Sequence, residues 1–221
     1  METQKSIWFI TLLLTIIAGY CDTVTFVAVD SIFSAHVTGN FIVFAYHIIK
    51  GSDMNSWIRL LTFPTFIIAI IIGGWIAGNS TYKYKLLLWE GIMLTIAGSA
   101  ATVLQAYNIF PEARIYLIAM IVVVAMGLQN AFGKLYSKET YGPTTMMTGN
   151  VTQASLDLGN LLRTFFHDSE ILSNFKKQLV TVFGFLVGCL LGALAGKYWG
   201  LGTLLVPGIM MLFCYLKTVK N

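Results

Sequence analysis

The stretch "LLTFPTFIIAIIIGGWIAG", residues 60–78, decides the fold class, because none of its 19 residues carries a charge. A helix of about 20 apolar residues crosses the roughly 30 Å hydrocarbon core of a bilayer. Comparable uncharged runs occupy 179–196 and 198–216, and two further runs, 86–107 with one Glu and 115–133, come close. The sequence therefore predicts an all-α fold, that of a polytopic α-helical membrane protein.

The composition supports a membrane protein and argues against other classes. The 221 residues are 57% hydrophobic and 11% charged, whereas soluble domains carry about 25% charged residues. The net charge of +4 is spread over short loops and both ends, which indicates membrane topology and leaves no basic stripe for a nucleic acid. The three cysteines, Cys21, Cys189 and Cys214, lack disulfide or metal spacing and are expected to be free thiols that pack in the interior.

The N-terminus could be a secretory signal, because Lys5 precedes an apolar run over 7–18 that ends in "GYCD". A lipoprotein cleavage site requires a small residue before Cys21, and Tyr20 stands there. We therefore expect an uncleaved first span and a single transmembrane domain over residues 1–221.

The tripeptide Thr-Gly-Asn occurs twice, at Thr38–Asn40 and at Thr148–Asn150, each time at the start of an apolar segment. The preceding spans also align, because "AGYCD" (18–22) corresponds to "MGLQN" (126–130). A glycine-rich span follows in both cases. These matches predict an internal repeat, with two homologous halves at residues 7–107 and 115–216.

Two topologies fit this repeat. If both Thr-Gly-Asn segments are full crossings, the protein has eight spans and parallel halves, and its 14 Lys and Arg residues divide nine to five in favour of the side with the termini. If both are broken or re-entrant helices, six full crossings and inverted halves result, and the 14 residues divide ten to four. Both schemes place the termini in the cytoplasm. The polar composition of 143–162 favours broken elements, because such a segment is too polar to face lipid.

Asp22 is the strongest candidate for chemistry inside the membrane, because an ionisable side chain within a span costs about 2.5–3.5 kcal/mol on insertion scales. It is either a proton or substrate site or the N-cap of the next helix. Its counterpart in the second half, Asn130, cannot titrate, so a proton-linked role would rest on the first half. Glu90 stands early in its span, and we expect it to reach the lipid headgroups.

Each Thr-Gly-Asn segment is a candidate binding site. Glycine allows a sharply turned backbone, and Thr or Asn can accept hydrogen bonds from the free N–H groups of the next turn. An exposed helix start attracts anions, and transporters with internal repeats place broken helices around a substrate at the midplane. The alternative is a turn with a cap and no ligand.

Asp157 follows Asn150 by seven residues and would share a helix face with it, either pairing with Arg163 or joining Asn150 in a polar cavity. His36 has no second ligand at helical spacing, so neither a metal nor a cofactor is predicted. The candidate residues for a substrate site are Asp22, Thr38, Gly39, Asn40, Gln129, Asn130, Thr148, Gly149, Asn150 and Asp157.

The stretches "AGYCDTVTFVAVDSIFSAHVTGN" (18–40) and "AMGLQNAFGKLYSKETYGPTTMMTGNVTQASLDLGN" (125–160) resemble the YoaK-like family of bacterial integral membrane proteins, known mainly as a domain of unknown function. The likeness extends over nearly the whole chain. The matching positions include Gly19, Asp22 and Phe33. The resemblance implies a multi-pass protein of the bacterial inner membrane with a transport role that is not demonstrated, and it supplies no substrate.

The functional hypotheses follow from these features. The sequence contains no HExxH, no P-loop and no catalytic triad or carboxylate pair, so it does not predict an enzyme. The favoured hypothesis is a secondary transporter or permease for a small polar or anionic solute, with proton coupling through Asp22 as an option. The alternative is a non-transporting membrane scaffold or accessory subunit. A glycine stripe could join the two halves or the subunits of a homodimer, through Gly184, Gly188, Gly192 and Gly196.

Overall fold

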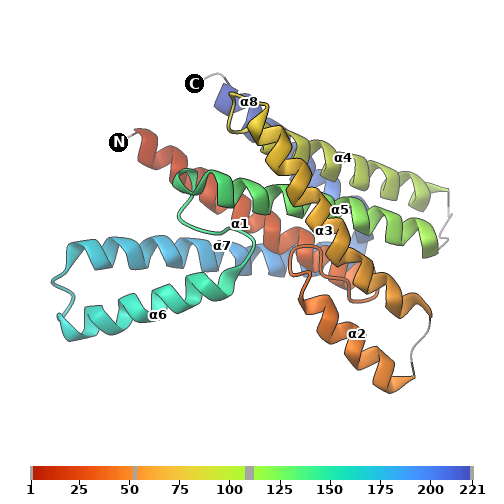
Figure 1. Ribbon diagram of the computed structural model, residues 1–221, viewed down its shortest axis with the longest axis horizontal. Helices are drawn as coiled ribbons and strands as arrows, with labels where there is room; N and C mark the ends of the chain where they lie inside the picture. Colours follow the sequence, from red (N-terminus) through yellow and green to blue (C-terminus); the bar gives the residue numbers. More distant parts are fainter. Residues whose placement is uncertain (1, 52–53, 108–111, 220–221) are drawn as a thin grey trace.

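The computed structural model describes residues 2–51, 54–107 and 112–219, and the regular structure in this part of the chain is helical. In chain order the helices are α1 (Glu2–Ala28), α2 (Gly39–Lys50), α3 (Ile58–Gly78), α4 (Lys85–Ala106), α5 (Glu112–Leu135), α6 (Met147–Arg163), α7 (Ser169–Trp199) and α8 (Leu205–Val219) (Figure 1). Three short 3₁₀ turns accompany them: η1 (Met54–Trp57), η2 (Ser137–Glu139) and η3 (Gly200–Leu204). The prediction of an all-α fold is confirmed.

Five segments of the described chain are long and apolar enough to cross a membrane: Ser6–Ala28, Ile58–Gly78, Lys85–Ala106, Ala113–Leu135 and the continuous stretch Ser169–Thr218, which contains α7 and α8. Large apolar side chains on the outside of these segments are exposed, among them Ile68, Trp75 and Leu190. Such side chains are stable against lipid tails, which are equally apolar. The chain is therefore a multi-pass membrane protein that associates with a lipid bilayer.

The two helices that begin at the Thr-Gly-Asn motifs, α2 and α6, are not among these segments. With 12 residues α2 is about 18 Å long, which is too short for a crossing. With 17 residues α6 is about 26 Å long, and it carries several polar side chains. Figure 1 shows α2 and α6 at opposite ends of the molecule.

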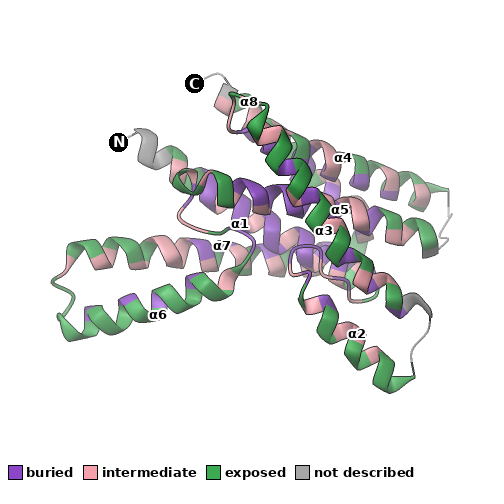
Figure 2. Ribbon diagram, in the orientation of Figure 1, coloured by how far each residue is buried: buried purple, intermediate pink, exposed green. Residues whose placement is uncertain are grey.

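The centre of the bundle is formed by α1 and α5, which run in opposite directions, as the colours of Figure 1 show. Helix α1 packs along α7, α5 packs along α3, and α4 packs along α8. Buried apolar residues gather where these helices cross (Figure 2), including Leu14, Ile17, Val122 and Met126.

Glycines bring α7 against α1. A Cβ atom at Gly188 would lie 2.1 Å from the carbonyl oxygen of Ile16, and a Cβ atom at Gly192 would lie 2.5 Å from that of Tyr20. Because the opposing atoms belong to backbone, no side-chain movement can make room for a larger residue. The glycine stripe therefore joins two helices of one chain.

Glu90 differs from its sequence-based prediction. Its side chain, on α4, is fully buried among the packed helices and does not reach the headgroups. The prediction was wrong because α8 packs over this part of α4, where Gly91 meets Met211 and Leu212.

Candidate functional site

The segment 29–38 returns the chain from the end of α1 to the start of α2. Asp30 and Ser31 have φ angles of 44° and 61°, in the left-handed region that reverses the direction of the chain. Neither residue is a glycine, so the sequence carries no clear signal for this turn. The reversal brings the second part of the segment back alongside α1, next to Asp22.

Asp22 is a hydrogen-bond acceptor for this returning segment. Its Oδ1 atom accepts a hydrogen bond from the backbone N–H of Ala35 at 2.7 Å and a longer one from that of His36 at 3.4 Å. The carboxylate thus supplies partners for backbone groups that no regular structure satisfies. The alternative that Asp22 is the N-cap of the next helix is wrong, because Asp22 lies inside α1 and Thr38 stands at the N-cap of α2.

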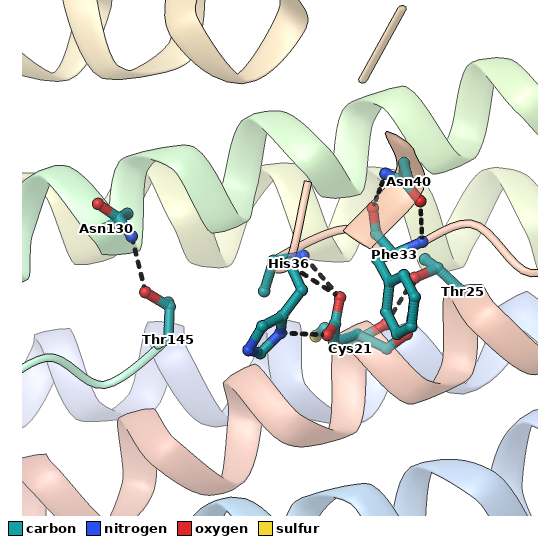
Figure 3. Close-up of polar contacts among 9 residues, drawn as sticks. Cys21, Thr25, Phe33, His36, Asn40, Asn130 and Thr145 are labelled. Atoms are coloured by element: carbon teal, nitrogen blue, oxygen red, sulfur yellow. Dashed lines mark hydrogen bonds and ion pairs between the residues drawn. The ribbon is translucent and has the colours of Figure 1, made fainter. Parts of the chain in front are cut away.

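The second oxygen of Asp22 pairs with a histidine. Its Oδ2 atom lies 2.7 Å from Nδ1 of His36. Figure 3 shows the His36 imidazole, with its contact drawn as a dashed line. The side chain of Asp22 is 5% exposed and that of His36 is 35% exposed. The hydrogen bond to Asp22 raises the pKa of His36, against the opposing effect of partial burial. The pair therefore combines a sealed carboxylate with an imidazole that is open on one side.

Asn40, in the first Thr-Gly-Asn motif, closes the returning segment. Its amide oxygen accepts from the backbone N–H of Phe33 and its amide nitrogen donates to the Phe33 carbonyl, both at 2.8 Å (Figure 3). The same nitrogen donates to Thr62 Oγ1 on α3 at 2.9 Å. Thr38 is exposed and makes no side-chain cap hydrogen bond. The predicted capping of the next turn is therefore wrong at this motif, because Asn40 bonds backward along the chain.

The segment 136–146 between α5 and α6 has related contacts. Asn150 donates to the carbonyl of Pro143 at 2.8 Å, and Asn130 donates to Thr145 Oγ1 at 2.8 Å (Figure 3). Met146 stands at the N-cap of α6, without a side-chain cap hydrogen bond. Here too the asparagine of the motif holds the preceding segment.

Gln129 ties this second segment to α1. Its amide nitrogen donates to the Leu14 carbonyl and to Thr144 Oγ1, both at 2.9 Å. The backbone N–H of Tyr141 adds a hydrogen bond to Thr11 Oγ1 at 3.0 Å. Gln129 is fully buried, so these contacts fix the segment against the central helix.

Glu139 anchors the same segment to the connection between α3 and α4. It accepts from Lys83 Nζ at 2.6 Å and from the Tyr84 hydroxyl at 2.7 Å. Burial alone would raise the pKa of Glu139, but the hydrogen bonds from Lys83 and Tyr84 outweigh burial and lower it.

Asp157 lies apart from these contacts. It is 7% exposed on α6 and accepts a hydrogen bond from Gln153 at 2.8 Å, one turn earlier. Neither an ion pair with Arg163 nor a hydrogen bond to Asn150 is found among the residues that the structure describes. Asp157 is held within its own helix instead.

The predicted residues therefore fall into two groups. Asp22 and Asn40 hold the segment 29–38, and Gln129, Asn130 and Asn150 hold the segment 136–146. Within the described residues, no hydrogen bond joins the first group to the second. The remaining motif residues are exposed or half-buried: Thr38, Gly39, Thr148 and Gly149.

Two residues were missed by sequence reasoning. His36 becomes the partner of Asp22 only through the fold-back of 29–38, which no pattern in the sequence predicts. Arg59, 1% exposed, donates to the Asp30 carbonyl at 2.7 Å and pairs with the Asp30 carboxylate. Its position inside an otherwise apolar span was an available signal, because a buried guanidinium requires acceptors.

The two connecting segments 29–38 and 136–146 and the Asp22–His36 pair define this protein as a helical membrane protein with polar groups held between its helices. The chain belongs to the family described as "Protein of unknown function (DUF1275)", whose family model matches residues 10–216. This membership is compatible with the resemblance to the YoaK-like proteins. Neither a curated protein nor a solved structure matches the chain.

Proposed function

We propose that the protein is a proton-linked permease for a small polar or anionic solute, with Asp22 and His36 as its proton-binding pair. One observation carries the proposal: a carboxylate that is 5% exposed is hydrogen-bonded to an imidazole that is 35% exposed, at a break between two helices. Ionisable groups inside membrane segments are expensive and commonly mark ion and substrate pathways. A charged pair is not needed to hold the chain at this place. At the corresponding contact of the segment 136–146, the neutral side chains of Asn130 and Thr145 are hydrogen-bonded instead.

The chemistry of the pair suits an anion. With His36 neutral, the pair carries the negative charge of Asp22 and repels an anion. A proton on His36 makes the pair neutral overall and gives an imidazolium that attracts an anion from its open side. Loss of that proton restores the negative charge of the pair and weakens the hold on the anion. This order of events couples one proton to one solute. It also removes the electrostatic repulsion between Asp22 and a negatively charged substrate.

We infer that α1–α4 and α5–α8 are two structural repeats, and the contacts at the motifs support this. Asn40 reaches back seven residues to Phe33, and Asn150 reaches back seven residues to Pro143. One helix earlier, Asp22 holds Ala35 and Asn130 holds Thr145.

Close approaches of helices add to this support. A Cβ atom at Gly19 on α1 would lie 2.3 Å from the Phe185 carbonyl oxygen on α7, and one at Gly127 on α5 would lie 2.6 Å from the Cβ atom of Ala69 on α3. The contact between α4 and α8 is reciprocal as well. Gly91 packs against α8, mainly Leu212 and Met211, and Gly208 packs against Thr95.

The directions of the helices favour inverted repeats with six crossings and two broken elements. Helices α1 and α5, which would correspond in the two repeats, run in opposite directions (Figure 1). Helix α1 begins and α8 ends at the same end of the bundle. We infer that this end faces the cytoplasm of a bacterial cell, in agreement with the excess of Lys and Arg expected there.

Transport in proteoliposomes tests the proposal. Purified protein is reconstituted with a pH-sensitive dye inside, and acetate, phosphate and sulfate are offered with and without a pH gradient, with glycerol as a neutral solute. We expect uptake of at least one anion to be accompanied by acidification of the lumen. Asp22→Asn should reduce this uptake to the level of protein-free vesicles, whereas Thr148→Ala, a change at an exposed residue, should not. Uptake that is unchanged in Asp22→Asn contradicts the role of the pair.

A second candidate function is a membrane scaffold or accessory subunit. The observation that favours it is that the motif asparagines bond to their own preceding segments, Asn40 through its amide oxygen and nitrogen and Asn150 through its amide nitrogen. In that case Asp22→Asn lowers thermal stability, and the wild-type protein transports none of the solutes.

A further inference from the structure

Glu90 is a buried carboxyl group that the proposed function does not use. It lies in the second turn of α4, its side chain is 0% exposed, and neither carboxyl oxygen has a hydrogen-bond partner within the described part of the chain. Burying an ionised carboxylate without a partner is far more costly than burying the neutral acid. Such a group is stable only when a proton or a cation neutralises it.

In the described part of the chain, no cation is paired with Glu90. The titratable groups that interact with it electrostatically are Cys21 on α1 and Cys214 on α8, and both are thiols. Among the described residues, no Lys, Arg or His forms an ion pair with Glu90. Lys217, at the end of α8, interacts with Cys214. No group of His, Cys, Asp and Glu side chains within the described residues is arranged to hold a metal ion.

Three other carboxylates in the described chain have donors. Asp22 is bonded to two backbone N–H groups and His36, Glu139 to Lys83 and Tyr84, and Asp168 accepts from two backbone N–H groups at the start of α7. Each of these carboxylates accepts at least two hydrogen bonds, whereas Glu90 accepts none within the described residues. The environment of Glu90 stabilises only the neutral form.

A route from the surface lies close to this site. A groove of about 260 Å³ between α1 and α8 is lined by Leu13, Phe213, Cys214 and Lys217. A small apolar reagent in the membrane that enters this groove reaches Cys214, which interacts electrostatically with Glu90.

We propose that Glu90 is a second proton-binding site in the membrane interior, separate from the Asp22–His36 pair, and that it carries a proton at neutral pH. This inference goes beyond the proposed function, since it holds whether or not the protein transports a solute.

Infrared spectroscopy of the purified protein in lipid tests the inference directly. A protonated carboxyl group gives a C=O stretching band that is resolved from the bands of ionised carboxylates and shifts on transfer to heavy water. We expect this band at neutral pH in the wild type and in Asp22→Asn, and we expect Glu90→Gln to lack it. A band that is unchanged in Glu90→Gln, or a wild type without the band, overturns the proposal. The Asp22→Asn arm separates this outcome from a failure of the proposed permease mechanism.

A chemical probe decides the matter if Glu90→Gln does not fold. Dicyclohexylcarbodiimide reacts with protonated carboxyl groups in apolar surroundings. The acid O–H adds across one C=N bond, the proton goes to nitrogen and the oxygen bonds to carbon, and an acyl shift to nitrogen then gives a stable N-acylurea. Peptide mass spectrometry of the wild type should find this adduct on Glu90 and not on Glu139, which is ion-paired outside the spans. An unmodified Glu90 overturns the proposal.

Discussion

The segments 29–38 and 136–146 have the same structural role but are held by different chemical groups. Each returns the chain from the end of a central helix to the start of a short one, and each is held by an asparagine that bonds back across seven residues. Helix α1 holds the first segment with the carboxylate of Asp22, and helix α5 holds the second with the amide of Asn130. The second segment has an ion pair of its own, Glu139–Lys83, but a neutral amide stands at the position that corresponds to Asp22. The architecture therefore does not require a charged pair at this position. This difference is the main physical reason to assign Asp22 and His36 a function.

The largest expected effect comes from the helices that support these two segments. Gly188→Ala on α7 would place Cβ 2.1 Å from the backbone of α1, whereas Gly127→Ala on α5 would place it 2.6 Å from the Cβ atom of Ala69 on α3. We expect Gly188→Ala to destabilise the protein by about 3 kcal/mol and Gly127→Ala by about 1–2 kcal/mol, the range for overpacking. Thermal unfolding in detergent measures both.

Gly74→Ala is the matched control, because nothing lies within 4 Å of its Cβ position on α3. This variant should be as stable as the wild type or slightly more stable, since alanine has the higher helix propensity. Equal losses in Gly188→Ala and Gly74→Ala would mean that the tight contact of α1 with α7 does not limit stability.

The next comparison concerns the two motif asparagines. Asn40→Ala removes two hydrogen bonds to Phe33 and one to Thr62, whereas Asn150→Ala removes one to Pro143 and a weaker contact with Met147 sulfur. We expect losses of about 2–3 kcal/mol for Asn40→Ala and about 1 kcal/mol for Asn150→Ala, because buried groups left without partners carry the cost. Thermal unfolding again measures the difference.

Thr148→Ala, at an exposed residue of the second motif, is the control and should have no measurable effect. If Asn150→Ala proves the more damaging of the two asparagine variants, the first segment is held mainly by Asp22.

The sequence allowed the spans to be predicted well, because an uncharged run of about 20 residues has few structural outcomes. The Thr-Gly-Asn motifs were predicted to be helix breaks because polar residues cannot face lipid, and the structure places each motif at the start of a helix. Their hydrogen bonds were predicted in the wrong direction. Local rules favour capping of the following turn, whereas Asn40 and Asn150 bond to the preceding segment.

The features that could not be predicted depend on tertiary contacts. His36 reaches Asp22 because the backbone is left-handed at Asp30 and Ser31. A glycine at these positions would have indicated such a turn, whereas these two residue types do not. Glu90 was expected near the headgroups because its depth was judged from its distance to the start of α4. Its burial comes from α8, which no local pattern could place over it.

The smallest expected effect is a difference in pH dependence between the two segments. The hydrogen bond to Asp22 raises the pKa of folded His36 above its ordinary value of 6.5. The stability that this pair supplies is therefore fully present below pH 6.5 and is lost as the pH rises through the higher pKa of the folded state. We expect the melting temperature of the wild type to fall over this interval and that of His36→Gln to stay level, with exposed His167→Gln following the wild type. Asn130→Ala, which removes a bond between neutral groups, should lower the melting temperature by the same amount at every pH. A wild-type profile that His36→Gln reproduces would mean that the imidazole near Asp22 gains no proton on folding, and the proposed uptake of a proton together with an anion would lose its basis.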